Sequence, residues 1–154
     1  MRQYTPTIAV LTRVIKNGDS LTACFNEAIL NPEQKALCFG VIRWYYQLEI
    51  IGYQLFNTPL KPKDFTVALH VYIGLFQIMH MNMPDYAIVK EMVTAIKKTK
   101  FKWAASLINK VLRRFIDEQD TLMIPVNQSD KGRYAHPKWI IKQLKHAYPK
   151  QWET

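Results

Sequence analysis

The sequence contains little glycine and little cysteine, with five glycines and two cysteines among 154 residues. The glycines, at positions 18, 40, 52, 74 and 132, cannot form a GxGxxG or Walker loop, which excludes phosphate binding by loops of those kinds. Cys24 and Cys38 each lie among apolar neighbours, as small buried thiols do in a reducing compartment, so a disulfide scaffold is not expected. Low-complexity tracts and repeats are also absent, and we expect one folded domain with a real core.

Residues 65–84 contain no Asp, Glu, Lys or Arg, and this segment is about as long as a membrane span. Polar residues interrupt it at His70, Gln77, His80 and Asn82, and an unpaired polar group is costly in hydrocarbon. We therefore expect a buried central helix and no membrane partner. The N-terminus lacks the long apolar stretch and the cleavage site of a secretory signal, which favours a cytoplasmic protein.

Acidic residues are absent between Met92 and Ile116, and the later part of the chain is strongly basic. Residues 97–154 hold 13 basic and five acidic side chains, in a protein whose formal net charge is +9. A basic run without acids favours a phosphate-bearing partner, and the alternative is an ordinary solvated face. The candidate binding residues in this run are Lys97, Lys98, Lys100, Lys102, Lys110, Arg113 and Arg114.

Apolar residues recur at helical spacing through most of the chain, which predicts an all-α fold of six or seven helices. The first helix is expected from about residue 7 to residue 16, with Asn17 and Gly18 closing it, and the second begins after Ser20. A capping box formed by Asn31 and Gln34 starts the third. One long helix then carries an apolar stripe with spacings of three and four, made of Leu37, Val41, Trp44, Leu48, Ile51 and Leu55.

The later helical pattern indicates how the chain is divided. A fifth helix is expected from about Tyr86 to Ile96, ending in the lysine run, and a sixth over about residues 101–117 places its basic residues opposite its apolar face. Residues 118–133 lose the helical period and are interpreted as a linker. Residues 134–154 form a further amphipathic stretch with nothing after it to cover its apolar stripe, so we expect the full protein to continue.

The titratable residues show no catalytic or metal-binding spacing. His70 and His80 are ten residues apart, as are His136 and His146, and this spacing turns the two members of a pair about 80° apart on a helix. Carboxylates are scattered singly except in the hydrophilic segment 117–120. We therefore expect no catalytic residue, no metal and no cofactor in this span.

Several helix segments resemble signatures of the NusB-like domain of bacterial 16S rRNA cytosine-C5 methyltransferases, and the likeness runs over nearly the whole chain. They are LCFGVIR at 37–43, GLFQI at 74–78, MPDYA at 83–87 with Glu91, and LINKVLRRF at 107–115. Most of these are packing positions shared with the standalone transcription antitermination factor NusB. Two later segments, YAHPKWII at 134–141 and AYPKQW at 147–152, are similar to the junction where the methyltransferases leave this domain.

The resemblance implies a NusB-like, RNA-binding helical bundle over residues 1–117 and a linker at 118–133. Residues 134–154 would begin a linking subdomain before an absent catalytic domain. In such enzymes that catalytic domain uses S-adenosylmethionine and a pair of cysteines. Neither Cys24 nor Cys38 has the surroundings of that pair, so we interpret both as structural.

The implied role of this span is to bind 16S rRNA and position it for the protein's own C-terminal catalytic domain. The resemblance adds Arg13 and Arg43 to the candidate RNA-binding residues, because basic residues near the N-terminal helices of the NusB fold also approach RNA. An ordinary surface arginine is the alternative at both positions. The competing functions are a standalone NusB-type antitermination factor and a protein interaction module, with a protein partner or a second copy of the chain.

Overall fold

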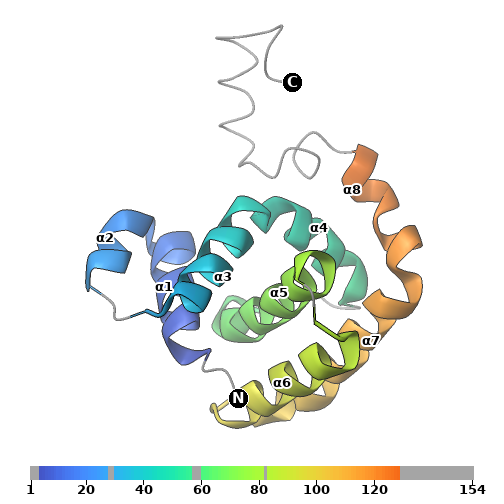
Figure 1. Ribbon diagram of the computed structural model, residues 1–154. Helices are drawn as coiled ribbons and strands as arrows, with labels where there is room; N and C mark the ends of the chain where they lie inside the picture. Colours follow the sequence, from blue (N-terminus) through green and yellow to red (C-terminus); the bar gives the residue numbers. More distant parts are fainter. Residues whose placement is uncertain (1–3, 28–29, 57–59, 82, 129–154) are drawn as a thin grey trace, which may run out of the picture.

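The computed structural model describes residues 4–27, 30–56, 60–81 and 83–128. These residues form eight α-helices and two short 3-10 helices, with no strand among them (Figure 1). The prediction of an all-α fold is confirmed. In chain order the elements are α1 (Thr5–Asn17), α2 (Leu21–Glu27), α3 (Pro32–Arg43), α4 (Tyr45–Leu55), η1 (Pro62–Asp64), α5 (Phe65–His80), α6 (Asp85–Lys97), η2 (Lys102–Ala104), α7 (Ala105–Leu122) and α8 (Ile124–Gln128).

Helix α5 is the central helix of the bundle, and it packs against α1, α3, α4, α6 and α7. Figure 1 shows α1 to α3 on one side of α5 and the antiparallel pair α6 and α7 on the other. Every residue from Val67 to Leu75 is buried, as expected for a helix that is apolar around its whole circumference. No helix in the described part of the chain has both the length and the apolar content to cross a bilayer.

Polar groups on α5 have partners inside the core. His70 Nδ1 lies 2.7 Å from the carbonyl oxygen of Thr66, one turn earlier. Gln77 is fully buried, and its side-chain amide donates a hydrogen bond to the Tyr4 hydroxyl at 3.3 Å. These contacts lower the cost of placing polar side chains in the interior.

The starts and ends of the first three helices follow their local sequence signals. Gly18 closes α1 in the left-handed conformation, with φ of 74°, which glycine adopts without steric cost. The Ser20 hydroxyl accepts a hydrogen bond from the Ala23 backbone N–H at 3.4 Å as α2 begins. The Asn31 side chain accepts from the Gln34 N–H at 2.7 Å, and the Gln34 side chain accepts from the Asn31 N–H at 2.9 Å. The predicted capping box is confirmed.

The expected long helix over Leu37 to Leu55 is wrong, because the chain breaks at Trp44 into α3 and α4. Trp44 has φ of −103° and ψ of 15°, outside helical geometry. Its indole ring stacks on His80 of α5, with ring centroids 5.3 Å apart. The break therefore sits where a contact with a distant helix holds the side chain, while the rest of the apolar stripe still faces the core.

The segment after residue 117 also differs from expectation, because α7 continues to Leu122 and α8 follows it. A kink at Glu118, with φ of −118° and ψ of 25°, marks the place where the helical pattern weakens. Beyond the kink, Leu122 and Val126 are buried, and α8 packs against α4 and α7. Residues 119–122 and 124–128 are therefore helical, whereas the sequence predicts an irregular linker there. The expected amphipathic stretch at 134–154 lies outside the described residues.

Glycine permits a close approach between the two longest helices. A Cβ atom added at Gly74 of α5 would lie 2.9 Å from Leu112 Cδ1 of α7, closer than real Cβ atoms come. Since Leu112 is fully buried, its side chain has little room to move. The contact fixes α7 against the central helix and leaves the opposite face of α7 free for polar residues.

Candidate nucleic-acid interface

The turn between α6 and α7 is well defined because Thr99 makes two hydrogen bonds there. The Thr99 hydroxyl donates to the carbonyl oxygen of Ile96 at 2.8 Å. The Phe101 backbone N–H in turn donates to the Thr99 hydroxyl oxygen at 3.0 Å. Lys98 caps α6, and the 3-10 turn η2 leads directly into α7. The lysines in this turn are thus carried on an ordered connection.

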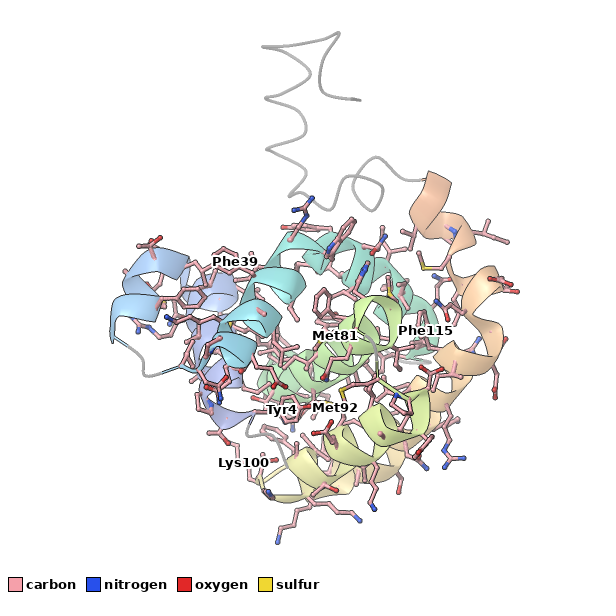
Figure 2. The ribbon with its side chains drawn as sticks, in the orientation of Figure 1. Tyr4, Phe39, Met81, Met92, Lys100 and Phe115 are labelled. Atoms are coloured by element: carbon pink, nitrogen blue, oxygen red, sulfur yellow. The ribbon has the colours of Figure 1, made fainter. Side chains whose placement is uncertain are left out.

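Four exposed lysines lie at this turn, and we call them the junction lysines: Lys97, Lys98, Lys100 and Lys102. Figure 2 shows Lys100 at the outer edge of the bundle, whereas Met92 and Phe115 lie inside it. The Lys100 ammonium lies 5.4 Å from the centre of the Phe101 ring. None of the junction lysines forms an ion pair with another residue in the described ranges. Their positive charge therefore faces solvent.

The basic residues of α7 belong to two different environments. Lys110 and Arg113 are exposed, and Arg113 Nε donates to Asn109 Oδ1 at 2.9 Å. Arg114 is half-buried, and its Nε lies 2.9 Å from Glu118 Oε2. An Arg114 terminal nitrogen also donates to the Gln54 carbonyl oxygen at 3.3 Å, which joins α7 to α4. Arg114 is therefore tied into the fold more than its neighbour.

Arg13 and Arg43 lie apart from the junction lysines. Arg13 is on α1, and its Nε forms an ion pair with Asp19 Oδ2 at 3.1 Å. Arg43 ends α3, where it is exposed and lies 5.5 Å from the centre of the Trp44 ring. The main packing partners of α1 and α3 do not include α6 or α7. The basic residues at 97–113 are thus grouped on α6, α7 and the turn between them. Arg13 and Arg43 lie on other helices, outside this group.

A second group of cations was not found from the sequence. Lys61 and Lys63, on either side of Pro62, line a cavity of about 480 Å³ together with Lys110 and Arg114 of α7. In the sequence the segment around Pro62 indicates only a break between helices. Its lysines stand more than 40 residues before Lys110, so the two segments meet only through tertiary packing, in which α4 and α5 contact α7 and η1 contacts α5.

Both cysteines are fully buried. Burial raises the pKa of the Cys38 thiol to about 12, and the nearby Cys24 adds a smaller effect in the same direction. Cys38 is therefore protonated at neutral pH, whereas nucleophilic cysteine chemistry needs the thiolate. Histidine, cysteine and carboxylate side chains do not gather in threes anywhere in the described residues.

The described fold is an all-helical domain built around an uncharged central helix, and comparison with known proteins identifies its family. The family described as NusB matches residues 7–117. The chain belongs to the NusB family. This confirms the family and the type of bundle that the sequence segments predict.

The chain is also similar to longer proteins. It is 36% identical over 155 residues to a protein named probable ribosomal RNA small subunit methyltransferase B from Coxiella burnetii, covering 100% of this chain and 36% of that protein. Proteins named ribosomal RNA small subunit methyltransferase B from Vibrio vulnificus and Proteus mirabilis are 36% and 37% identical, and each alignment covers 94% of this chain. The chain spans 35–36% of the length of these relatives.

Proposed function

We propose that this chain is the cytoplasmic, RNA-binding N-terminal module of an rRNA cytosine-C5 methyltransferase that uses S-adenosylmethionine. The module would hold 16S rRNA so that a C-terminal catalytic domain, outside this chain, meets its target cytosine. The observation that carries the proposal is the group of exposed junction lysines without acidic partners in the described ranges. A surface of this kind attracts the phosphates of nucleic acid.

The similar proteins support this proposal over a standalone antitermination factor. Their names describe small-subunit rRNA methyltransferases, and each is almost three times as long as the matched span. In a protein of that length the domain described here would be one part among others. The family match ends at residue 117, and we assign residues 1–117 to the RNA-binding helical domain, residues 118–133 to its connection and residues 134–154 to the start of a linking subdomain.

In this proposal the methyl-transfer reaction takes place in the catalytic domain. Methyl transfer to cytosine C5 needs a nucleophilic thiolate and the methyl donor S-adenosylmethionine. The buried, protonated thiol of Cys38 does not fit that role, and Cys24 is equally inaccessible. We therefore expect the isolated chain to show no methyl transfer, and we assign its residues to RNA binding and positioning alone.

Binding would come mainly from phosphate contacts. Protein cations release counterions from single-stranded RNA with a slope of about −0.7 in log K against log salt for each phosphate neutralised. Four to seven contacts, from the junction lysines with Lys110, Arg113 and Arg114, give a slope of about −3 to −5. The tight packing of α7 on α5 would present these charges in a fixed arrangement and so limit the entropy lost on binding.

The test reverses three junction lysines together, Lys98→Glu, Lys100→Glu and Lys102→Glu. RNA affinity is measured by filter binding over a salt series, and folding by circular dichroism. We expect weaker binding and a slope smaller in magnitude by about 2, because three phosphate contacts are lost. The matched control is the double variant Lys35→Glu, Lys90→Glu, with exposed lysines on α3 and α6, and it is compared with the double variant Lys98→Glu, Lys100→Glu, which has the same net charge. Equal effects of these two double variants would contradict the proposal.

A protein interaction module is the second candidate function, and one observation favours it. Phe39 of α3 is 59% exposed, and it lines a surface hollow with Arg43 and Trp44. Exposed aromatic and arginine side chains are common at protein interfaces. Pull-down with the isolated chain after nuclease treatment separates the candidates, because a protein contact survives and an RNA-mediated one does not. A nuclease-resistant partner lost in Phe39→Ala would favour this candidate.

A further inference from the structure

The cavity lined by Lys61, Lys63 and Lys110 combines positive charge with an exposed tryptophan. Trp103, in the 3-10 turn η2, lines the same cavity and is 57% exposed. The cavity volume of about 480 Å³ lies within the range of pockets that bind small organic groups, about 300–1,000 Å³. Trp103 directly follows Lys102, so the cavity adjoins the junction lysines along the chain.

The charge around the cavity is unbalanced. Three exposed lysines and the half-buried Arg114 line it, with Asp64 as the single acidic residue. None of the three lysines has an ion-pair partner in the described part of the chain. Arg114 is held by Glu118 and the Gln54 carbonyl, so the lysines supply the charge that is free to meet a ligand. The positive charge of these three lysines favours an anionic ligand.

The interior of the cavity is apolar. Leu55 at the end of α4 and Leu107 and Val111 on α7 line it together with the indole of Trp103. A simple anion such as free phosphate makes no favourable contact with an apolar surface of this kind. A nucleotide has both an anionic phosphate and an aromatic base, and bases stack on tryptophan in proteins that bind single strands.

We propose that this cavity binds one unpaired nucleotide of the RNA, with its base against Trp103 and its phosphate among the surrounding lysines. The proposal rests on the proposed function and adds that the RNA must offer a base that is not in a duplex. RNA bases in loops, bulges and single strands are free to stack in this way, whereas bases inside an A-form helix are not. The junction lysines would bind neighbouring phosphates.

The test compares Trp103→Ala with Tyr86→Ala in the 154-residue chain. Tyr86 is 77% exposed and lies in the first turn of α6, at the opposite end of that helix from the junction lysines. The probes are a short mixed-sequence single-stranded RNA and the same RNA in a duplex. Since stacking on an aromatic residue changes affinity by about 1–3 kcal/mol per base, Trp103→Ala should weaken single-strand binding about 5- to 150-fold. Duplex binding should change less than twofold.

Further readouts separate stacking from charge and from folding. Trp103→Ala should leave the salt slope unchanged, because indole carries no charge, and Trp103→Phe should keep most of the affinity. Replacing Lys61, Lys63 and Lys110 by Gln should reduce the magnitude of the slope by about 0.7, because the site neutralises one nucleotide phosphate. Should Trp103→Ala not fold, tryptophan emission is followed instead. Single-stranded RNA should then quench wild type more than Trp103→Phe, and duplex RNA should not.

The outcomes distinguish this proposal from the broader one. Unchanged single-strand affinity in Trp103→Ala, with wild type binding normally, overturns the nucleotide site and leaves the RNA-binding function intact. An equal loss for single strand and duplex also overturns it, since a duplex has no base free to stack. Wild type that binds neither RNA overturns both proposals.

Discussion

Helices α5 and α7 pack against each other, but their residues are distributed differently around the helix axis. Helix α5 buries consecutive residues from Val67 to Leu75, whereas α7 buries one face and exposes the other. The middle of α5 is enclosed by five other helices and buried, so packing determines its sequence there. Helix α7 contributes to the core and carries cations outside it. Substitutions in α5 should therefore change stability, and those on the outer face of α7 should change binding.

The largest effect is expected for Ile73→Ala in the middle of α5. Ile73 is fully buried, and deleting its larger side chain should lower the free energy of unfolding by about 2–5 kcal/mol. Urea denaturation measures this, with Ile73→Val as the milder control at about 0.5–1.5 kcal/mol. RNA affinity measured where the variant is still folded should equal that of wild type. Impaired RNA binding by folded Ile73→Ala protein would contradict the claim that α5 affects stability and not binding.

The contact between the two helices gives the next largest effect. Gly74→Ala should lower the free energy of unfolding by about 1–3 kcal/mol, because the new methyl group would overlap with Leu112. In a Leu112→Ala background the same change should cost less, since the obstructing side chain is gone. Thermal or urea unfolding of the four proteins measures this coupling. Equal costs in both backgrounds would show that the overlap is not what makes glycine necessary there.

Neighbouring arginines on α7 allow a finer comparison. Arg114→Ala removes the hydrogen bond to the Gln54 carbonyl and should lower the free energy of unfolding by about 0.5–1.5 kcal/mol. Arg113→Ala should change it by less than about 0.5 kcal/mol, since this side chain is exposed. Arg113→Ala should instead reduce the salt slope of RNA binding by about 0.7. Stability loss in Arg113→Ala equal to that in Arg114→Ala would contradict this division.

The smallest effect is a pH dependence that originates in α5. Burial lowers the pKa of His70, and the hydrogen bond to Thr66 opposes this only in part. The unfolded chain then binds a proton at His70 more readily than the folded chain does. The contribution of His70 to the free energy of unfolding should therefore be complete above about pH 6.5 and decrease as the pH falls below that value. His70→Asn should flatten this dependence relative to wild type in urea titrations at a series of pH values. Parallel curves for the two proteins would argue against it.

Local sequence signals were sufficient for much of the fold. The capping box at Asn31 and the left-handed Gly18 depend on residues within four positions of each other, so the sequence shows them directly. The uncharged segment 65–84 likewise indicates a central helix, because its burial follows from composition. Such features need no knowledge of distant contacts.

Features that depend on tertiary contacts were missed. The break at Trp44 coincides with a stacking contact to His80, 36 residues later, and the apolar spacing continues through it undisturbed. The sequence after Glu118 predicts a linker because it loses the apolar period and contains acids and Pro125. Its buried residues, Leu122 and Val126, are few and become meaningful only when α4 lies beside them.

The candidate site shows the same limit. The junction lysines are close together in the sequence, so their charge is visible without a structure. The cavity cations come from α7 and from the segment around Pro62, which are close only in the folded chain, and Trp103 has no sequence feature that marks it as exposed. Arg13 and Arg43 were proposed from the resemblance alone, and their participation in RNA binding stays a prediction.

The most direct measurement of the central claim is the change in backbone amide NMR shifts when single-stranded RNA is added to the chain. If the outer face of α7 and the turn before it form the binding surface, the largest changes should fall at residues 97–114 and at Lys61 and Lys63. Residues 67–75 inside the bundle should change little. Changes confined to α1–α3, or spread evenly over the surface, would contradict the account.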